Sequence, residues 1–158
     1  MKNKKAVYLI VGLIVIALVA CFMFFPSQKA FAPAPVDSQN STGGITYKNA
    51  SSDVIVVDLP YVNGIVLRDF SAMGKARGQW FFEASFPVEV LDNQGKPLAS
   101  GIAQAQGDWM TTEFVPFKAD IKIPESYTGP ATIVLKKDNP SGIPENDASV
   151  SFSINIRD

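Results

Sequence analysis

The segment SVSFSINIR, residues 149–157, decides the fold because apolar and polar residues alternate along its whole length. The apolar positions are Val150, Phe152, Ile154 and Ile156. A period of two places these side chains on one face of an extended strand. The opposite face carries serine, asparagine and arginine and should meet water. This segment is therefore predicted to be a half-buried strand of an antiparallel sheet.

The same period predicts a strand in WFFEASFPVEV, residues 80–90, with Phe81 as an aromatic exception on the polar face. Its expected buried face comprises Trp80, Phe82, Ala84, Phe86, Val88 and Val90. DNQGK, starting at Asp92, has the composition of a hairpin turn. Further strands are predicted at residues 53–59, 66–74, 97–106, 113–123 and 131–137.

These segments give about seven strands at the spacing of a sandwich. No helical period occurs after residue 25. The predicted fold is therefore all-β, an immunoglobulin-like antiparallel β-sandwich of about seven strands. The single cysteine is Cys21, so residues beyond it form no disulfide with one another and the core alone must stabilise the domain.

The alternation fails in AQAQGDWMTTEFVPF, residues 103–117. Extending the inward face back from Phe117 would bury Glu113 and turn Phe114 outward. A bulge near Pro116 would return Phe114 to the core, and this is the expected arrangement. The pattern does not decide whether Trp109 belongs to the core or to a binding surface.

An uncharged apolar run of 20 residues, Ala6 to Phe25, follows three lysines at positions 2, 4 and 5. At about 1.5 Å per residue, such a helix just crosses a hydrocarbon layer of about 30 Å. The lysines place the N-terminus in the cytoplasm. The predicted organisation is a basic cytoplasmic tip (1–5), a transmembrane signal anchor (6–25), a Pro/Ala/Ser-rich linker (26–44) and an extracytoplasmic domain (45–158).

Two other fates of the apolar run remain open. LVAC, residues 18–21, resembles a lipoprotein signal, in which case the signal ends at residue 20 and Cys21 carries the lipid. Cleavage after AFA, residues 30–32, would instead release the domain, although Pro33 would follow the cut. If the run is a signal anchor or a lipoprotein signal, the expected location is the cell membrane, with the domain outside.

Charge and composition narrow the classes of function. From Pro33 onward the chain has ten basic and fifteen acidic residues, a net charge of −5. This balance disfavours nucleic acid and anionic lipid as partners. The chain has no histidine, no cysteine beyond Cys21 and no GxSxG or SxxK motif. An enzyme is therefore not expected, and no cofactor is predicted apart from a calcium ion considered below.

Three segments resemble a known family: ARGQWFFEASFPVEVLD (76–92), AQAQGDWMTTEFVPFKA (103–119) and VLKKDNPSGIPENDASV (134–150). They are similar to the Gmad2 domain, an immunoglobulin-like domain associated with bacterial spore germination. The resemblance runs from about Ile45 to Arg157. It implies an exported, membrane-attached bacterial protein with a sandwich fold and a binding or scaffolding role, but no specific activity.

Four residues near predicted turns are candidates for a binding surface: Trp80, Phe81, Asp108 and Trp109. Tryptophans at loop ends can stack on sugar rings or anchor a protein partner. Sandwich cores also commonly bury a tryptophan, which is the alternative for both Trp80 and Trp109. Arg77 is expected to form a structural ion pair with a nearby carboxylate, that of Glu83 or alternatively Asp108 or Asp138, and so to tie neighbouring loops together.

An acidic loop, KDNPSGIPENDAS, gathers Asp138, Asn139, Glu145 and Asp147. These are oxygen donors of the kind that calcium accepts, although the spacing fits no EF-hand. Asx residues beside Pro and Gly are also ordinary turn formers.

The predicted function is a non-catalytic, membrane-tethered binding or scaffolding domain of the bacterial cell envelope. Its expected partner is an envelope protein or cell-wall glycan. The alternative is a calcium-dependent or cell-wall-glycan-binding module.

Overall fold

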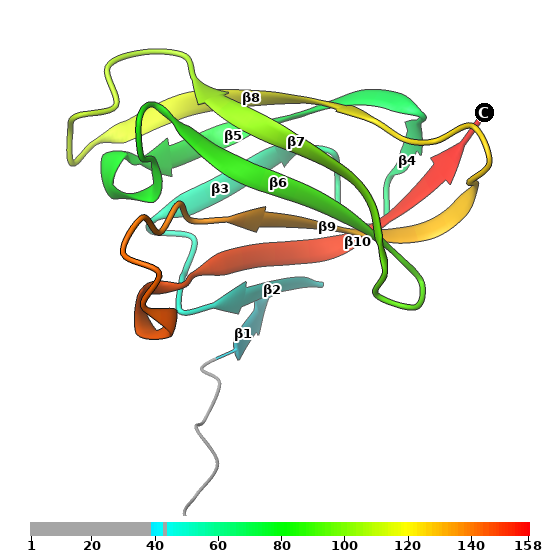
Figure 1. The fold of residues 1–158 in the computed structure, drawn as a ribbon, viewed down its shortest axis with the longest axis horizontal. Helices are drawn as coiled ribbons and strands as arrows, with labels where there is room; N and C mark the ends of the chain where they lie inside the picture. The colour runs from blue at the N-terminus through cyan, green and yellow to red at the C-terminus, as the bar shows by residue number, and fades with distance from the viewer. Residues whose placement is uncertain (1–38, 43) are drawn as a thin grey trace, which may run out of the picture. The chain divides into compact units, whose positions relative to one another are not determined.

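The computed structural model describes residues 39–42 and 44–158. It is an all-β domain with two short 3₁₀ turns (Figure 1). The elements within the described residues are β1 (Gln39–Thr42), β2 (Ile45–Lys48), β3 (Ile55–Leu59), β4 (Ile65–Leu67), β5 (Asp69–Arg77), η1 (Gly78–Trp80), β6 (Ser85–Asp92), β7 (Pro97–Ala105), β8 (Phe114–Lys122), β9 (Gly129–Lys136), η2 (Pro144–Asn146) and β10 (Ser149–Arg157).

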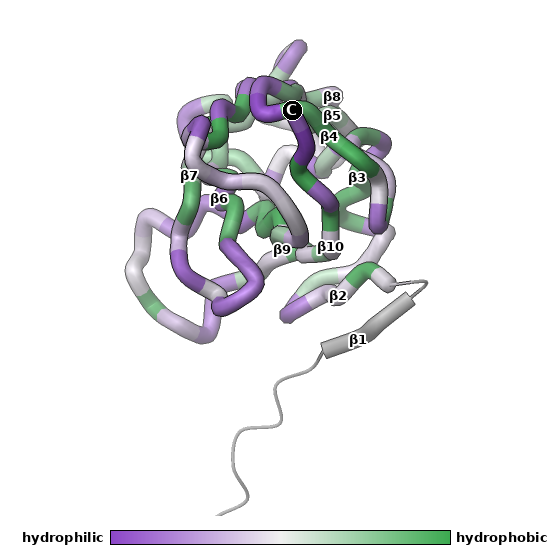
Figure 2. The backbone as a smooth tube through the Cα atoms, turned by 90° about the vertical axis from the view of Figure 1, so that its right-hand side faces the viewer, coloured by the Kyte–Doolittle hydropathy of each residue, from purple (hydrophilic) through white to green (hydrophobic). Residues whose placement is uncertain are grey.

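The strands follow the order β1-β2-β10-β9-β6-β7-β8-β5-β3, and β4 pairs with β10. All these neighbours are antiparallel except β4 and β10, which are parallel. The sheet curls over through the β6–β7 hairpin, and β7 is joined to β8 by two residue pairs, so that β2, β10 and β9 face β8, β5 and β3 across the core (Figures 1 and 2). This is an immunoglobulin-like β-sandwich whose two layers remain joined along one side.

The core lies between the two layers and is filled by alternate residues of the long strands. Phe86 is 0% exposed, and its ring centroid lies 5.0 Å from that of Phe117, 5.2 Å from that of Phe81 and 6.4 Å from that of Trp80. Such offset and edge-to-face pairs stabilise a core beyond the area they bury. Every second residue of β10, from Val150 to Ile156, is buried as well.

Most of the strand predictions are confirmed. β10 has the predicted bounds, and β3, β5, β7, β8 and β9 fall on the predicted segments with shifts of a few residues at their ends. The hairpin at Asp92 is also confirmed, since the Asp92 carboxylate accepts hydrogen bonds from the backbone N–H groups of Gln94 and Lys96, each at 2.8 Å. The described residues hold ten strands rather than about seven, because β1, β2 and β4 are short and lack a clear apolar period.

The predicted strand at residues 80–90 is correct only from Ser85. Trp80 belongs to η1, and Glu83 and Ala84 have φ angles of 50° and 62°, in the left-handed region. This reversal breaks the period of two, so Phe81 is buried and Phe82 is 42% exposed, opposite to the prediction.

The expected bulge near Pro116 is also wrong. β8 pairs with β5 without a register shift from Phe114 to Lys122. Phe114 therefore stays on the outer face, where the Arg77 guanidinium lies 4.4 Å and the Lys75 ammonium 5.2 Å from its ring centroid. The Phe114 ring is therefore packed against these two cations and not against the apolar core.

The predicted membrane segment (6–25), its alternative signal ending at residue 20, and Cys21 lie outside the described residues. In the part of the chain that the structure describes, no helix is long and apolar enough to cross a membrane. β1 falls inside the stretch predicted as a linker, 26–44.

Candidate binding surface

Four connections meet at one end of the sandwich, which we call the loop end: residues 49–54, 78–84, 106–113 and 137–148. They meet because each follows a strand that ends there and leads into a strand that begins there, on the left of Figure 1. Loops 106–113 and 137–148 join paired antiparallel strands, whereas 49–54 and 78–84 connect strands that are not neighbours in the sheet. Loops on a rigid sandwich are the usual place for recognition in this architecture. The contacts between these loops decide whether they form one surface.

Arg77, the last residue of β5, joins two of the loops. Its Nε donates to the carbonyl of Asp53 at 2.8 Å, and a terminal guanidinium nitrogen donates to the carbonyl of Thr112 at 2.9 Å. The guanidinium also lies over Phe114, which fixes its plane. A planar group with several donors can bridge two carbonyls in this way. Loops 49–54 and 106–113 are thereby held to each other.

The η1 turn packs against two further loops. Gly78 lies so close to the backbone carbonyls of Trp109 and Thr111 that a Cβ atom could not fit between them. The carbonyl of Trp80 accepts a hydrogen bond of 3.1 Å from the backbone N–H of Asp138. Loop 78–84 therefore contacts both 106–113 and 137–148.

The acidic loop completes the set. The Asn49 side chain donates to the carbonyl of Asp147 at 2.9 Å, which ties loop 49–54 to loop 137–148. Within the acidic loop, the Asn139 amide donates to the Asp147 carboxylate at 2.7 Å and to the Ile143 carbonyl at 2.8 Å. All four loops are thus linked, and they form one ordered surface.

Large apolar side chains are exposed on three of these four loops. Phe82 is 42%, Met110 77% and Ile143 50% exposed. Exposed apolar groups held on ordered loops are candidates for contact with a partner. None of these three side chains was among the predicted site residues. Met110 follows a Gly-Asp turn, and this turn could have indicated its exposure. The exposure of Phe82 results from the left-handed backbone of Glu83 and Ala84, which no sequence motif predicts.

The four predicted binding-surface residues separate in the structure. Trp80 and Phe81 are 1% and 4% exposed and belong to the core, so they cannot form a binding surface. Asp108 is exposed, and its carboxylate accepts a hydrogen bond of 3.0 Å from the Met110 N–H, which shapes the turn. Trp109 is partly buried. Only Asp108 and Trp109 therefore lie at the surface that was predicted.

The predicted ion pair between Arg77 and Glu83 does not form. The carboxylate nearest to the Arg77 guanidinium is that of Glu113, at 4.0 Å, and that side chain is 82% exposed. At this distance the pair is not a hydrogen bond. Arg77 does join neighbouring loops as expected, but through backbone carbonyls, because η1 turns the chain away before Glu83 can approach it.

The acidic loop is arranged as a set of turns. The Asn139 side chain donates a hydrogen bond to the Asp147 carboxylate, while Asp138 precedes η2 and Glu145 lies within it. Within residues 39–42 and 44–158, no three histidine, cysteine, aspartate or glutamate side chains gather to hold a metal ion. The geometry therefore gives the calcium hypothesis no support.

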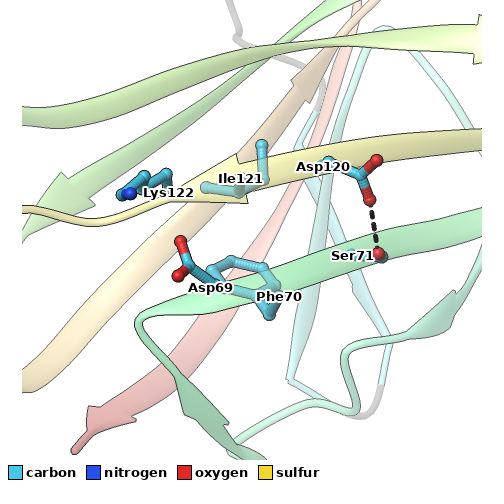
Figure 3. A pocket seen from close by; sticks show the side chains of 6 residues that line it. All are labelled: Asp69, Phe70, Ser71, Asp120, Ile121 and Lys122. Atoms are coloured by element: carbon cyan, nitrogen blue, oxygen red, sulfur yellow. Dashed lines mark hydrogen bonds between the residues drawn. The ribbon is translucent and has the colours of Figure 1, made fainter.

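A separate pocket of about 300 Å³ lies on β5 and β8, lined by Asp69, Phe70, Ser71, Asp120, Ile121 and Lys122 (Figure 3). The Ser71 hydroxyl donates to the Asp120 carboxylate at 2.6 Å, and Lys118 donates to it as well, at 3.2 Å. These hydrogen bonds, that of Ser71 first, lower the pKa of Asp120. Ser71 and Asp120 were not among the predicted site residues, although both fall on the outward positions of their strands.

A family model described as Gmad2, the immunoglobulin-like domain of bacterial spore germination, matches residues 54–143. No curated protein matches the chain. No solved structure matches it either. The matched residues include loops 78–84 and 106–113 in full, residues 137–143 of the acidic loop, and of loop 49–54 only its last residue, Val54.

Proposed function

The chain belongs to the Gmad2 family of immunoglobulin-like domains of bacterial spore germination, and from this we propose that it is a non-catalytic binding or scaffolding domain of the bacterial cell envelope whose binding surface is the loop end. The predicted N-terminal anchor would hold the domain at the outer side of the membrane. The observation that carries the proposal is the set of four mutually linked loops that expose Phe82, Met110 and Ile143.

Physical reasons support a binding role for this end. Association is favoured when apolar side chains lose contact with water, and less freedom is lost when the loops are already ordered. Arg77, Gly78 and Asn49 hold the loops through contacts that need no partner. Catalysis is not proposed, because the chain has no histidine and its one cysteine lies at position 21.

A native gel of membranes solubilised in mild detergent tests this proposal with the full-length chain. The unchanged chain should migrate as a discrete complex larger than the chain itself. Met110→Gln with Ile143→Gln should release the free chain, since both substitutions remove exposed apolar contacts.

The matched control is Ile102→Gln with Leu67→Gln, because these side chains are 54% and 60% exposed but lie away from the loop end. The control should leave the complex intact. Free chain in every sample, or equal loss in both double variants, would contradict the proposal.

A cell-wall glycan is a second candidate ligand, favoured by the partly buried Trp109 beside the exposed Met110. An indole with one free edge or face can stack on a sugar ring. Purified sacculi should then sediment the detergent-solubilised chain, and Trp109→Ala should abolish this. Sedimentation that is unchanged in the variant would argue against the glycan.

A further inference from the structure

Charge is distributed unevenly over the domain. The four loops of the loop end carry a single basic residue, Lys137, and a net charge of −6. The remaining described residues carry nine basic and seven acidic side chains, a net charge of +2. The acidic residues of the loop end are Asp53, Glu83, Asp108, Glu113, Asp138, Glu145 and Asp147.

Basic residues at the bordering strand ends do not reverse this charge. Lys48, Arg77 and Lys136 lie next to the loops, and counting them still leaves a net charge of −3. The Arg77 guanidinium is directed at two backbone carbonyls. The Lys136 ammonium lies 2.7 Å from the carboxylate of Glu89, a residue of β6 outside the loops.

Several carboxylates of the loop end are available to a partner. Glu83 and Glu145 are exposed, and among the described residues neither side chain takes part in a hydrogen bond or ion pair. The Glu113 side chain is 82% exposed, and its carboxylate lies 4.0 Å from the Arg77 guanidinium, which is too far for a hydrogen bond. These three residues come from the same three loops that expose Phe82, Met110 and Ile143, so negative charge and exposed apolar side chains occur together at the loop end.

We propose that the partner of the loop end is a basic protein segment in which lysine or arginine accompanies apolar side chains. This inference rests on the proposed function and adds the chemistry of the partner. Phe82, Met110 and Ile143 would contact its apolar side chains, and the carboxylates of the same loops would attract its cations. Complementary charge speeds encounter and excludes partners of the wrong sign. An anionic lipid surface would be repelled by the same end.

Two short synthetic peptides of the same apolar residues test the inference, one with lysine and one with glutamate at all polar positions. Each is titrated against the full-length chain in neutral detergent. The lysine peptide is expected to bind at least about tenfold more tightly, and its binding to weaken as NaCl rises from about 0.05 to 0.3 M.

A pair of charge variants separates the loop end from the net charge of the chain. Glu83→Gln, Glu113→Gln and Glu145→Gln together remove three negative charges from the loop end and no hydrogen bond that holds the loops. This variant should bind the lysine peptide about five- to tenfold more weakly. The control combines Asp58→Asn, Asp69→Asn and Glu125→Gln, which change the net charge equally at exposed positions elsewhere. It should change the affinity less than about twofold.

Equal affinity for the two peptides, or equal loss in the two charge variants, would overturn the inference. The native gel keeps this failure distinct from failure of the proposed function. If Met110→Gln with Ile143→Gln still releases the free chain, the loop end binds a partner of other chemistry. If it does not, both proposals fail together.

Discussion

Arg77 should stabilise the loop end more than any other single polar side chain described. Each of its two hydrogen bonds to a carbonyl would contribute about 1.5–3 kcal/mol if fully buried. The side chain is 36% exposed, so about 1 kcal/mol for each is the appropriate figure. Its contact with Phe114 adds about 0.5–1 kcal/mol. Arg77→Ala should therefore lower the free energy of unfolding by about 2.5–3 kcal/mol.

Arg77→Lys distinguishes the bridging role from the charge. A lysine ammonium keeps the positive charge but has no planar fork with which to reach the carbonyls of Asp53 and Thr112 together. Arg77→Lys should therefore lower the free energy of unfolding by about 1–2 kcal/mol. Urea denaturation followed by tryptophan fluorescence measures both variants, and amide hydrogen exchange should show faster exchange in loops 49–54 and 106–113.

Glu113→Gln is the control for this prediction. Its carboxylate lies 4.0 Å from the guanidinium and is largely exposed, so the substitution should change stability by less than about 0.5 kcal/mol. If Glu113→Gln destabilises the domain as much as Arg77→Lys does, an ion pair holds the loops and the reasoning from the carbonyl contacts is refuted.

Three further outcomes follow from the packing and the pKa values. Phe86→Ala removes a fully buried ring and should cost about 3–5 kcal/mol in urea denaturation, and a cost below about 1 kcal/mol would contradict the described core. The lowered pKa of Asp120 contributes stability that is present above the unfolded-state pKa of about 3.9 and is lost as pH falls through the folded-state pKa. Ser71→Ala should raise that pKa toward its ordinary value in a carbon NMR titration, and an unchanged pKa would exclude the hydroxyl as its cause. Gly78→Ala should lower the free energy of unfolding by about 1–3 kcal/mol, because backbone carbonyls occupy the space of the new methyl group. Gly107→Ala should change it by less than about 0.5 kcal/mol, since the atom nearest to its new methyl group is 3.9 Å away. Equal effects of the two substitutions in thermal melts would contradict this.

The long strands could be predicted because burial on one face leaves a period of two in the sequence. β10 carries this period without interruption, and its bounds were predicted correctly. The start of β6 was predicted wrongly, because Glu83 and Ala84 adopt left-handed φ angles that reverse the chain. Non-glycine residues seldom adopt such angles, so the sequence does not indicate the reversal. β2 pairs with β10 although only Tyr47 of its residues is buried, so it leaves too little pattern to detect.

The candidate surface was predicted only in outline. Turn residues indicated the loops at 106–113 and 137–148, whereas most of 78–84 was predicted as strand. The contacts that join them are long-range: Asn49 and Asp147 are 98 residues apart, and Arg77 and Thr112 are 35 apart. Such pairs follow from the topology rather than from local sequence. For the same reason Arg77 was correctly expected to tie loops together, but with the wrong partner.

Site-specific photo-crosslinking in intact cells tests most directly whether the loop end is the binding surface. A photoreactive residue is placed in the full-length chain at Met110 and, for comparison, at Ile102 on the outer face of β7. The account predicts a discrete adduct from Met110 and none from Ile102. No adduct at Met110, or the same adducts from both positions, would contradict a binding role for the loop end.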